Sequence, residues 1–451
     1  MTPVAFTLIS LAGILVLSLP RHHAIIPLII GITLIPMGSV LYLGPANFHS
    51  MRILVFFGML RIISKKERIN GNLNGIDICT ILWALVMLVT GALQPKLDTT
   101  FITRLGEVYD VTGLYFIMRF LVKDQADIFT IFKTLAVILC IMSLFMAIEK
   151  ITQFNPFSLL GGVRSSPAIR NGRVRCQGPF TSAIMAGTVA ATSIAWFFIL
   201  FKIKNFPRLF VFSGAIAAIM VVFLSASSGP IMSMLLCAVG FAFWPLRDNM
   251  KAVRITLFLS ILALHFTMSS PVWYLMAKID LTGSSTGWHR AELINSAIKY
   301  MNEWWMIGTT YTRHWMPTGI AWSPNHTDIT NQFIKNGVAG GILAMLLFIF
   351  KIYYGFKIVG KTLVNIPESN SLYKMLVWSL GATLFSHTVT FLSVRYYDQS
   401  MLYFYLLLAM ISCLQHSFTL ENQASPEDNQ QKNFSNFLDY NHVTIKPLKS
   451  A

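Results

Sequence analysis

Charged side chains are scarce in this chain. Only 12% of its 451 residues are charged, against about 25% in a soluble domain, while 55% are hydrophobic and the mean hydropathy is +0.61. This composition excludes an ordinary soluble enzyme and predicts an integral membrane protein. Acidic residues are scarcer than basic ones, with 19 Asp and Glu against 35 Lys and Arg, which gives a net charge of +16. Basic residues that flank apolar spans follow the positive-inside rule, so the charge indicates membrane lipid, and no nucleic acid, as a partner.

Cysteine frameworks and nucleotide-binding motifs are also missing. Four of the five cysteines lie in apolar runs and Cys176 stands alone in a loop, which excludes a disulfide framework and a zinc site of recognised spacing. The chain has no Walker loop, no GxSxG elbow and no HExxH motif. We therefore expect no metal and no cofactor, and the energy for any reaction must come from the substrate or from a gradient.

Long apolar runs make up most of the chain. Thirteen runs of roughly 17–22 residues have the length that a bilayer requires, which predicts an all-α polytopic membrane protein with about 12–13 transmembrane helices. Twelve is the alternative because Glu107, Asp110 and Arg119 interrupt the fifth run. The runs lie near 4–20, 24–43, 48–63, 76–94, 103–122, 130–149, 180–201, 208–225, 230–246, 252–270, 334–354, 374–392 and 399–416.

The predicted organisation is a single polytopic membrane domain, 1–417, followed by a polar tail, 418–451. The first run has no basic region before it and no cleavage site, so we expect a retained helix. Basic residues cluster in alternate connections, at 61–68, 202–208, 247–254 and 351–361. The positive-inside rule makes that side cytoplasmic. The N-terminus and the loops at about 150–180 and 271–334 then face outward, and the tail is a disordered cytoplasmic extension.

The loop at 271–334 concentrates polar chemistry in an otherwise apolar chain. It holds His289, His314 and His326. His326 is the candidate base, because an imidazole with a pKa near 6.5 accepts a proton at neutral pH, and Asp328 is the candidate to orient it. Two alternatives are a structural histidine and a metal site formed by the three histidines with Glu292, although their spacing matches no recognised metal signature.

A helix is expected to begin within the same loop. Small hydroxyl residues, including Ser285 and Thr286, precede an amphipathic segment that carries Arg290 near its start. Free backbone amides, the helix dipole and the guanidinium would together form an anion site. The alternative is a capped amphipathic helix on the membrane surface, with Trp288, Trp304 and Trp305 as its interfacial belt.

The outward loop at 150–180 breaks the positive-inside rule with four arginines, Arg164, Arg170, Arg173 and Arg175. Arginine binds a diphosphate well because its planar fork donates two parallel hydrogen bonds. The alternative is a solvated charge run or an anchor to anionic lipid headgroups. The short segment SASSGP, 225–230, is interpreted as a plain turn.

The order of these features resembles the superfamily of O-antigen ligases and Wzy-type O-antigen polymerases. In HTDITNQFIKNGVAGG, His326 is followed eleven residues later by Gly337 and then by Gly340, as at the end of the large loop in that family. The segment GWHRAELINSAIKYMNEWWMIG matches a second family element through Arg290. The segment RCQGPF matches a third through Arg175, with Arg173 as a second candidate. Thr327 stands where the family often has Asn, and Ser228 where it often has Arg.

The resemblance implies a GT-C-like fold in a bacterial inner membrane with its active face in the periplasm. The implied reaction is inverting, metal-independent transfer of a glycan from undecaprenyl diphosphate to a hydroxyl of a glycan, lipid A core or protein. Other polysaccharide-assembly proteins are the implied protein partners. It implies that Arg175 and Arg290 bind the diphosphate and His326 activates the acceptor. Arg173, His289, Ser285, Thr286 and Asp328 are the expected substrate-binding residues. The alternative function is a lipid-linked glycan flippase.

Overall fold

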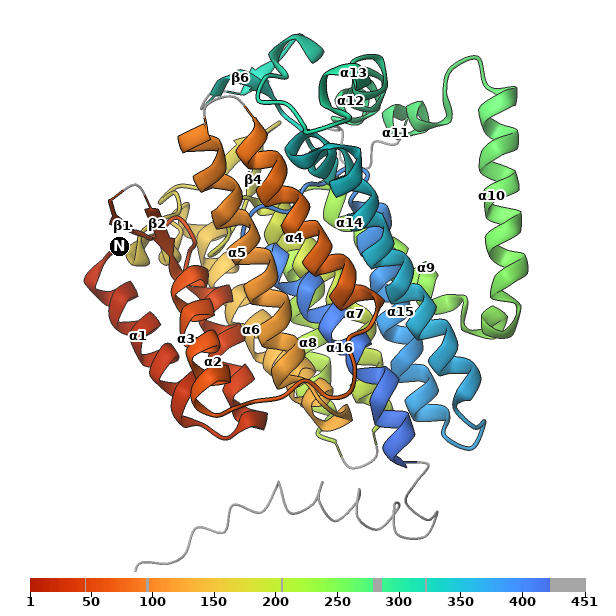
Figure 1. Ribbon diagram of the computed structural model, residues 1–451. Helices are drawn as coiled ribbons and strands as arrows, with labels where there is room; N and C mark the ends of the chain where they lie inside the picture. Colours follow the sequence, from red (N-terminus) through yellow and green to blue (C-terminus); the bar gives the residue numbers. More distant parts are fainter. Residues whose placement is uncertain (45, 95–96, 204–205, 279–285, 321–322, 422–451) are drawn as a thin grey trace, which may run out of the picture.

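The protein is described here by a computed structural model covering residues 1–44, 46–94, 97–203, 206–278, 286–320 and 323–421. Most of it is helical, and its long helices form one bundle (Figure 1). The long helices are α1 (Pro3–Ser18), α2 (Arg21–Leu34), α3 (Ser50–Ser64), α4 (Gly75–Leu93), α5 (Leu97–Leu121), α6 (Gln125–Thr152), α7 (Ala183–Lys202), α8 (Arg208–Leu224), α9 (Ser228–Ala242), α10 (Met250–Thr267), α14 (Gln332–Asn365), α15 (Ser371–Thr390) and α16 (Ser400–Glu421).

Shorter elements lie in the connections. Three antiparallel hairpins are formed by β1 (Val40–Leu43) with β2 (Ala46–His49), β3 (Ala168–Arg170) with β4 (Arg173–Arg175), and β5 (Gly319–Ile320) with β6 (Ser323–Thr327). The short helices are η1 (Pro156–Leu160), η2 (Trp244–Asn249), η3 (Val272–Tyr274), α11 (Leu275–Lys278), α12 (Gly287–Lys299), α13 (Met301–Trp304) and η4 (Arg313–Trp315).

Each of the thirteen predicted apolar runs overlaps one of the long helices. The second run is wrong in its later half, because α2 ends at Leu34 and residues 40–43 form strand β1. Pro36 lies two residues after the end of α2, and the residue before a proline is disfavoured in the α conformation. The expected tail from 418 overlaps the end of α16, and from 422 onward it lies outside the described residues.

Five stretches are long and apolar enough to cross a membrane: α4, α6, α7, the segment Trp244–Thr267 that contains α10, and α14. Shorter apolar helices accompany them, at α1, α2, α8, α9 and Ser400–Leu414 of α16. The chain is therefore a mostly helical protein whose long apolar helices indicate a membrane protein. A total of twelve or thirteen crossings stays a prediction.

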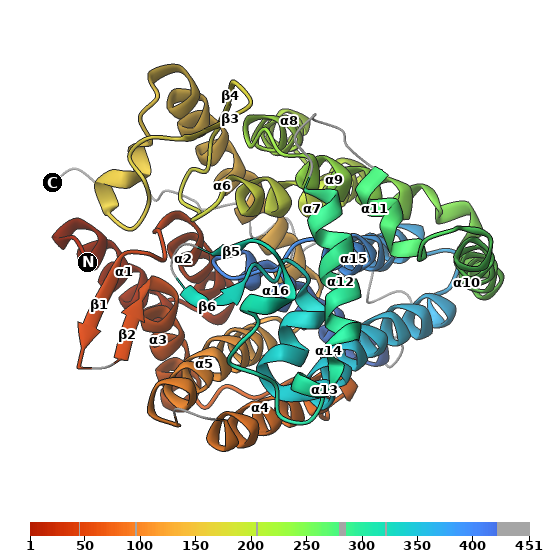
Figure 2. The same cartoon turned by 90° about the horizontal axis from the view of Figure 1, so that it is seen from above.

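The two polar loops lie at the same end of the bundle. The connection from α6 to α7 and the connection from α10 to α14 both cover the end shown uppermost in Figure 1 and facing the viewer in Figure 2. The connections from α3 to α4, α9 to α10 and α14 to α15 lie at the opposite end. This alternation has the form that the basic connections predict, and the side of the membrane to which each end belongs stays a prediction. The basic segment 351–361 is an exception: it was predicted as a connection but lies within α14, where Lys351 is buried.

The charges that interrupted the fifth run are paired within the bundle. Asp110 accepts from Nε and Nη2 of Arg52 on α3, both at 3.0 Å. Arg119 lies 3.4 Å from Asp77 on α4, and both side chains are almost completely buried. Glu107 faces Arg104 at 3.2 Å. Because an ion pair offsets part of the cost of removing charge from water, α5 continues through all three positions.

The long loop from α10 to α14 has a hydrophobic core of its own. It consists of Leu293, Ala297, Trp304, Trp315, Met316, Ile329, Ile334 and Val338. The alternative of a surface helix placed Trp304 in an interfacial belt, but Trp304 is buried in this core and donates to the carbonyl of Ala297 at 2.9 Å. Its ring lies so close to Gly337 that a Cβ there would approach it to 2.5 Å. The loop is therefore a packed cap, which we call the loop cap (287–331).

A break in α14 docks the loop cap onto the bundle. Gly340 and Gly341 leave the helical conformation, and Gly341 has φ +78° and ψ 178°, a region that only glycine adopts readily. There the amide of Ile342 donates to the carbonyl of Trp305 at 2.8 Å. Gln94 at the end of α4 donates to the carbonyl of Ile307. These bonds fix the cap above α4 and α14.

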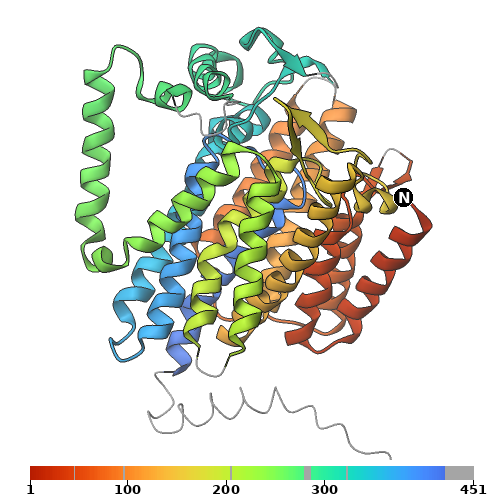
Figure 3. The ribbon, with the colours of Figure 1, turned by 180° about the vertical axis from the view of Figure 1, so that it is seen from behind.

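Helix α10 stands apart from the bundle (Figures 1 and 3). None of its residues is buried, although its composition is that of a membrane-spanning helix. An apolar helix that does not pack against protein is stable when lipid surrounds it. This helix carries the chain from one end of the bundle to the other, where the loop cap begins.

Candidate active site

Three segments far apart in sequence lie at the end of the bundle that carries the two loops. They are strand β4 with Arg175, helix α12 with Arg290, and strand β6 with His326 (Figure 2). The electrostatic neighbours of these residues connect them. Arg175 and Arg290 both interact with Arg170, while Arg290 also interacts with Asp328, two residues after His326. The three predicted catalytic residues are therefore arranged around one region.

Arg175 is held by its backbone and by one side-chain contact. The hairpin turns through Asn171 and Gly172, which have φ of +49° and +70°, as a tight two-residue turn requires. The guanidinium Nη2 donates to Ser227 Oγ at 2.7 Å, and Nε is buried without a partner in the described part of the chain. Burial lowers the pKa of Arg175, and the nearby charge of Arg170 lowers it further. A bound anion would offset both effects.

The segment after Arg175 is fixed to the bundle by backbone hydrogen bonds. The carboxylate of Glu149, at the end of α6, accepts from the amides of Gln177 and Gly178 at 2.9–3.2 Å. The amide of Cys176 donates to the carbonyl of Leu224 at 3.1 Å. Burial, then Glu149, raises the pKa of the Cys176 thiol to about 12, so this cysteine is no thiolate nucleophile.

The turn between α8 and α9 contributes to the site, contrary to its interpretation as a plain turn. Ser227 receives the hydrogen bond from Arg175, and its own hydroxyl donates to the carbonyl of Ser225 at 2.9 Å. This serine stands beside the position where the resembling family often carries an arginine. Arg173, the second candidate on β4, is exposed, and so is Arg170 on the paired strand β3.

Arg290 lies in the first turn of α12, with its Nε buried and without a partner among the described residues. Burial lowers its pKa, Arg170 lowers it further, and Asp328 acts in the opposite direction. Thr286 occupies the N-cap position, but its side chain makes no capping hydrogen bond. Ser285 lies outside the described residues. The positive charge at this helix start therefore comes chiefly from Arg290.

His289 ties α12 to the segment after β6. Its Nε2 lies 2.9 Å from the carbonyl oxygen of Asp328, and because a carbonyl only accepts, this nitrogen carries the hydrogen. The bond holds the start of α12 against the backbone of Asp328, next to His326. His289 thus positions two site segments relative to each other.

His326 is half-buried on β6 and is a competent base by geometry. Its Nδ1 lies 2.9 Å from Ser323 Oγ, so Ser323 orients the ring where Asp328 was expected to do so. Its Nε2 makes no hydrogen bond within the described ranges. Burial lowers the pKa of His326 below 6.5, and Arg104 and Arg395 lower it further. The imidazole is consequently neutral at pH 7 and able to accept a proton at Nε2.

Sequence reasoning missed three cations: Arg104 on α5 and Arg395 between α15 and α16, which interact with His326, and Lys335 on α14, which interacts with both of them. Arg104 and Lys335 share the carboxylate of Glu107. Arg395 lies over the ring of Tyr397, 5.6 Å from its centroid, and makes no ion pair in the described part of the chain. Burial lowers the pKa of Arg395, while Asp328 and Tyr397 raise it.

The connection from α15 to α16 joins the two halves of the site. Gln332 and Asn331, where α14 begins, bond to the carbonyls of Phe391 and Leu392 at 2.8 and 3.0 Å. On the other side, Asp398 accepts from the hydroxyl of Thr181 at 2.9 Å, and Gln399 donates to the carbonyl of Pro179 at 2.9 Å. This connection therefore holds Arg395 between the segment after Arg175 and the segment after His326.

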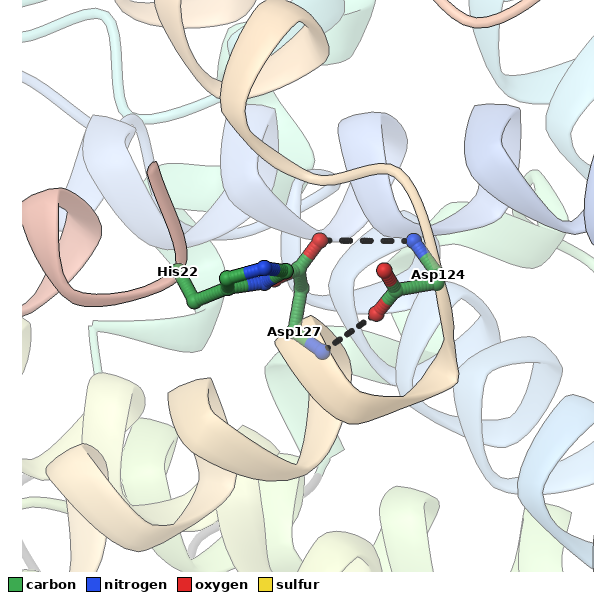
Figure 4. Close-up of side chains that lie close together, drawn as sticks. All are labelled: His22, Asp124 and Asp127. Carbon is green, nitrogen blue, oxygen red and sulfur yellow. Dashed lines mark hydrogen bonds and ion pairs between the residues drawn. The ribbon is translucent and has the colours of Figure 1, made fainter. Parts of the chain in front are cut away.

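The loop histidines each have a different partner, which gives the metal alternative no support. His314 lies 2.9 Å from Glu303, whereas His289 and His326 have the partners described above. Among the described residues, the one group of three possible ligands within 4.8 Å is His22, Asp124 and Asp127 (Figure 4). It lies where α2 and α6 begin, away from the loops. Arg21 bonds to both carboxylates and the two aspartates form the capping box of α6, so this group is a helix-capping network.

No protein-family model matches this chain, and a search of curated proteins finds no match either.

Proposed function

We propose that the protein transfers a glycan from a polyprenyl diphosphate, such as undecaprenyl diphosphate, to an acceptor hydroxyl. The observation that carries this proposal is the convergence of Arg175, Arg290 and a neutral, half-buried His326 at one end of an apolar helical bundle. A diphosphate needs cationic partners, and a hydroxyl nucleophile needs a base. The apolar bundle is the setting in which a lipid-linked donor is found.

The reaction requires two bonds to change at one carbon. The acceptor oxygen forms a bond to the anomeric carbon, and the bond from that carbon to the diphosphate oxygen breaks with its electron pair. His326 Nε2 takes the proton of the hydroxyl, and the polyprenyl diphosphate leaves with the additional negative charge. Because that charge grows in the transition state, Arg175 and Arg290 stabilise the transition state more than the ground state. Direct displacement inverts the configuration of the carbon.

The donor already carries the activation, so the proposed reaction uses no nucleotide and no metal. We place it on the periplasmic face of a bacterial inner membrane, because the two loops lie at the bundle end opposite the basic connections. The acceptor is a glycan on its lipid carrier in a polymerase, or lipid A core or protein in a ligase. Both belong to cell-envelope polysaccharide synthesis, such as lipopolysaccharide or exopolysaccharide.

The second candidate function is transport of a lipid-linked glycan. The observation that favours it is helix α10, which stands outside the bundle with none of its residues buried. A transporter, however, places its binding charges near mid-bilayer. Here Arg175 and Arg290, whose buried Nε atoms have no hydrogen-bond partner among the described residues, lie in the connections at one end, although Lys351 inside α14 also has no hydrogen-bond partner there. The position of the two arginines supports the transferase.

Transfer by purified protein in detergent, with an undecaprenyl-diphosphate-linked donor and a soluble acceptor, tests the proposal. Arg175→Ala and Arg290→Ala should weaken donor binding and slow transfer, and Arg290→Lys should recover only part because it loses the bidentate fork. His326→Ala should leave donor binding intact and lower turnover by about 10²–10⁴-fold. Arg164→Ala, an exposed arginine of the same loop, is the control. Wild-type protein that moves the lipid across vesicles but never transfers glycan would establish the transporter instead.

A further inference from the structure

The cations of the site fall into two groups. Arg175 and Arg290 share Arg170 as an electrostatic neighbour, and we call these three the donor-side cluster. Arg104, Lys335 and Arg395 form the base-side cluster, of which Arg104 and Arg395 interact with His326. Asp328 connects the clusters, since it interacts with both Arg290 and Arg395.

The base-side cluster has more positive charge than its own acids neutralise. Glu107 is the ion-pair partner of both Arg104 and Lys335, so one carboxylate serves two cations. Arg395 has no ion pair within the described ranges, and the acid that interacts with it is the exposed Asp328. The Nε of Arg104 is buried with no hydrogen-bond partner there. A buried guanidinium nitrogen without a partner is costly, and an anionic ligand would remove that cost.

Packing holds these cations in place before any ligand arrives. The stem of Arg104 lies against Gly91 of α4, where a Cβ would approach it to 2.8 Å. Lys335 is in the first turn of α14, and Arg395 is fixed by the bonds of its connection to Gln332 and Thr181. The three cations therefore come from α5, α14 and the α15–α16 connection, each anchored separately. Such preorganisation is typical of a binding site.

The geometry of displacement assigns the two clusters to different substrates. In an inverting reaction the acceptor oxygen approaches opposite the leaving group, so the base and the diphosphate clamp lie on opposite sides of the reacting carbon. Cations next to His326 are then next to the acceptor. We propose that the base-side cluster binds an oxyanion of the acceptor, a carboxylate or a phosphate monoester, near the hydroxyl that attacks. This inference rests on the proposed transfer and specifies its acceptor as acidic.

Three acceptors that differ in one group test the inference: a glycan ending in a neutral hexose, the same glycan ending in a uronic acid, and the same glycan ending in a hexose 6-phosphate. With wild-type protein at pH 8, kcat/KM should be at least about 10-fold higher for one of the acidic acceptors, the usual worth of one charge-assisted hydrogen bond. Arg395→Gln should reduce that preference to below about threefold while the donor KM stays unchanged. Arg395→Lys should retain part of it, and the control Arg164→Gln all of it.

Binding without donor separates this inference from the proposed function. Calorimetry with methyl glucuronide and with glucose 6-phosphate should detect binding of one of them to the wild type and its loss in Arg395→Gln. The acidic-acceptor site is overturned if neither acid binds to the wild type, or if Arg395→Gln keeps both the binding and the preference. In either case the proposed transfer to the neutral glycan still stands. Binding that depends on Arg395, in a protein that transfers to no acceptor, refutes the transfer reaction and keeps an anion site at the base-side cluster.

Discussion

Substitution of Gly341 by alanine should disrupt the candidate site, although Gly341 is not one of the site residues. Its φ of +78° and ψ of 178° are accessible chiefly to glycine, and an alanine there costs about 1–3 kcal/mol of backbone strain. The added Cβ would lie 2.2 Å from the carbonyl oxygen of Met306 and 3.0 Å from that of Trp305. Both are backbone atoms, so the loop cap must shift, at a cost of about 1–3 kcal/mol.

Gly341→Ala should therefore lose about 2–6 kcal/mol of stability, concentrated where the cap meets α14. The matched control is Gly360→Ala in the same helix, where a Cβ meets nothing within 4 Å. That change should be neutral or stabilise the helix by about 0.5–1 kcal/mol. Thermal unfolding in detergent, limited proteolysis within 287–331 and glycan transfer measure the difference. Equal melting, protease resistance and transfer in the two variants would refute the reasoning about the cap.

Three further predictions concern the site and its orientation. Because the pKa of His326 lies below 6.5, kcat/KM should rise with pH through that pKa to a plateau, and Arg395→Gln should move the rise to higher pH by removing a neighbouring cation; a pH-independent rate would exclude His326 as the base. Transfer should persist in excess EDTA, and its loss with recovery on adding a divalent ion would favour a metal site. Reporter fusions after Lys65, Arg247 and Lys361 should report cytoplasm and a fusion at Thr318 the outside; a cytoplasmic Thr318 would place the site in the wrong compartment.

The helices were predictable because apolar length is a local property of the chain. Each of the thirteen runs overlaps a long helix, and Asn74 and Asp124 begin two of these helices with capping boxes completed by Asp77 and Asp127. The error at 35–43 has the same origin, since apolarity continues past Pro36 while the backbone turns into a hairpin. Hydropathy measures the preference of a segment for an apolar environment and does not specify whether its backbone forms helical or strand hydrogen bonds.

The candidate residues His326, Arg290 and Arg175 were visible because polar side chains are rare in this chain and theirs gather in two loops. Arg395 and Lys335 could not be predicted from the sequence. They lie within or beside apolar runs, and their neighbours in the site are far away in sequence. Ser227 was predicted to lie in a plain turn, and only the fold places it where its hydroxyl accepts a hydrogen bond from Arg175. The sequence by itself determined the helices and the polar loops, because both follow from local composition. Only the tertiary structure decided which cations surround the base, because packing of α5, α14 and the α15–α16 connection brings them together.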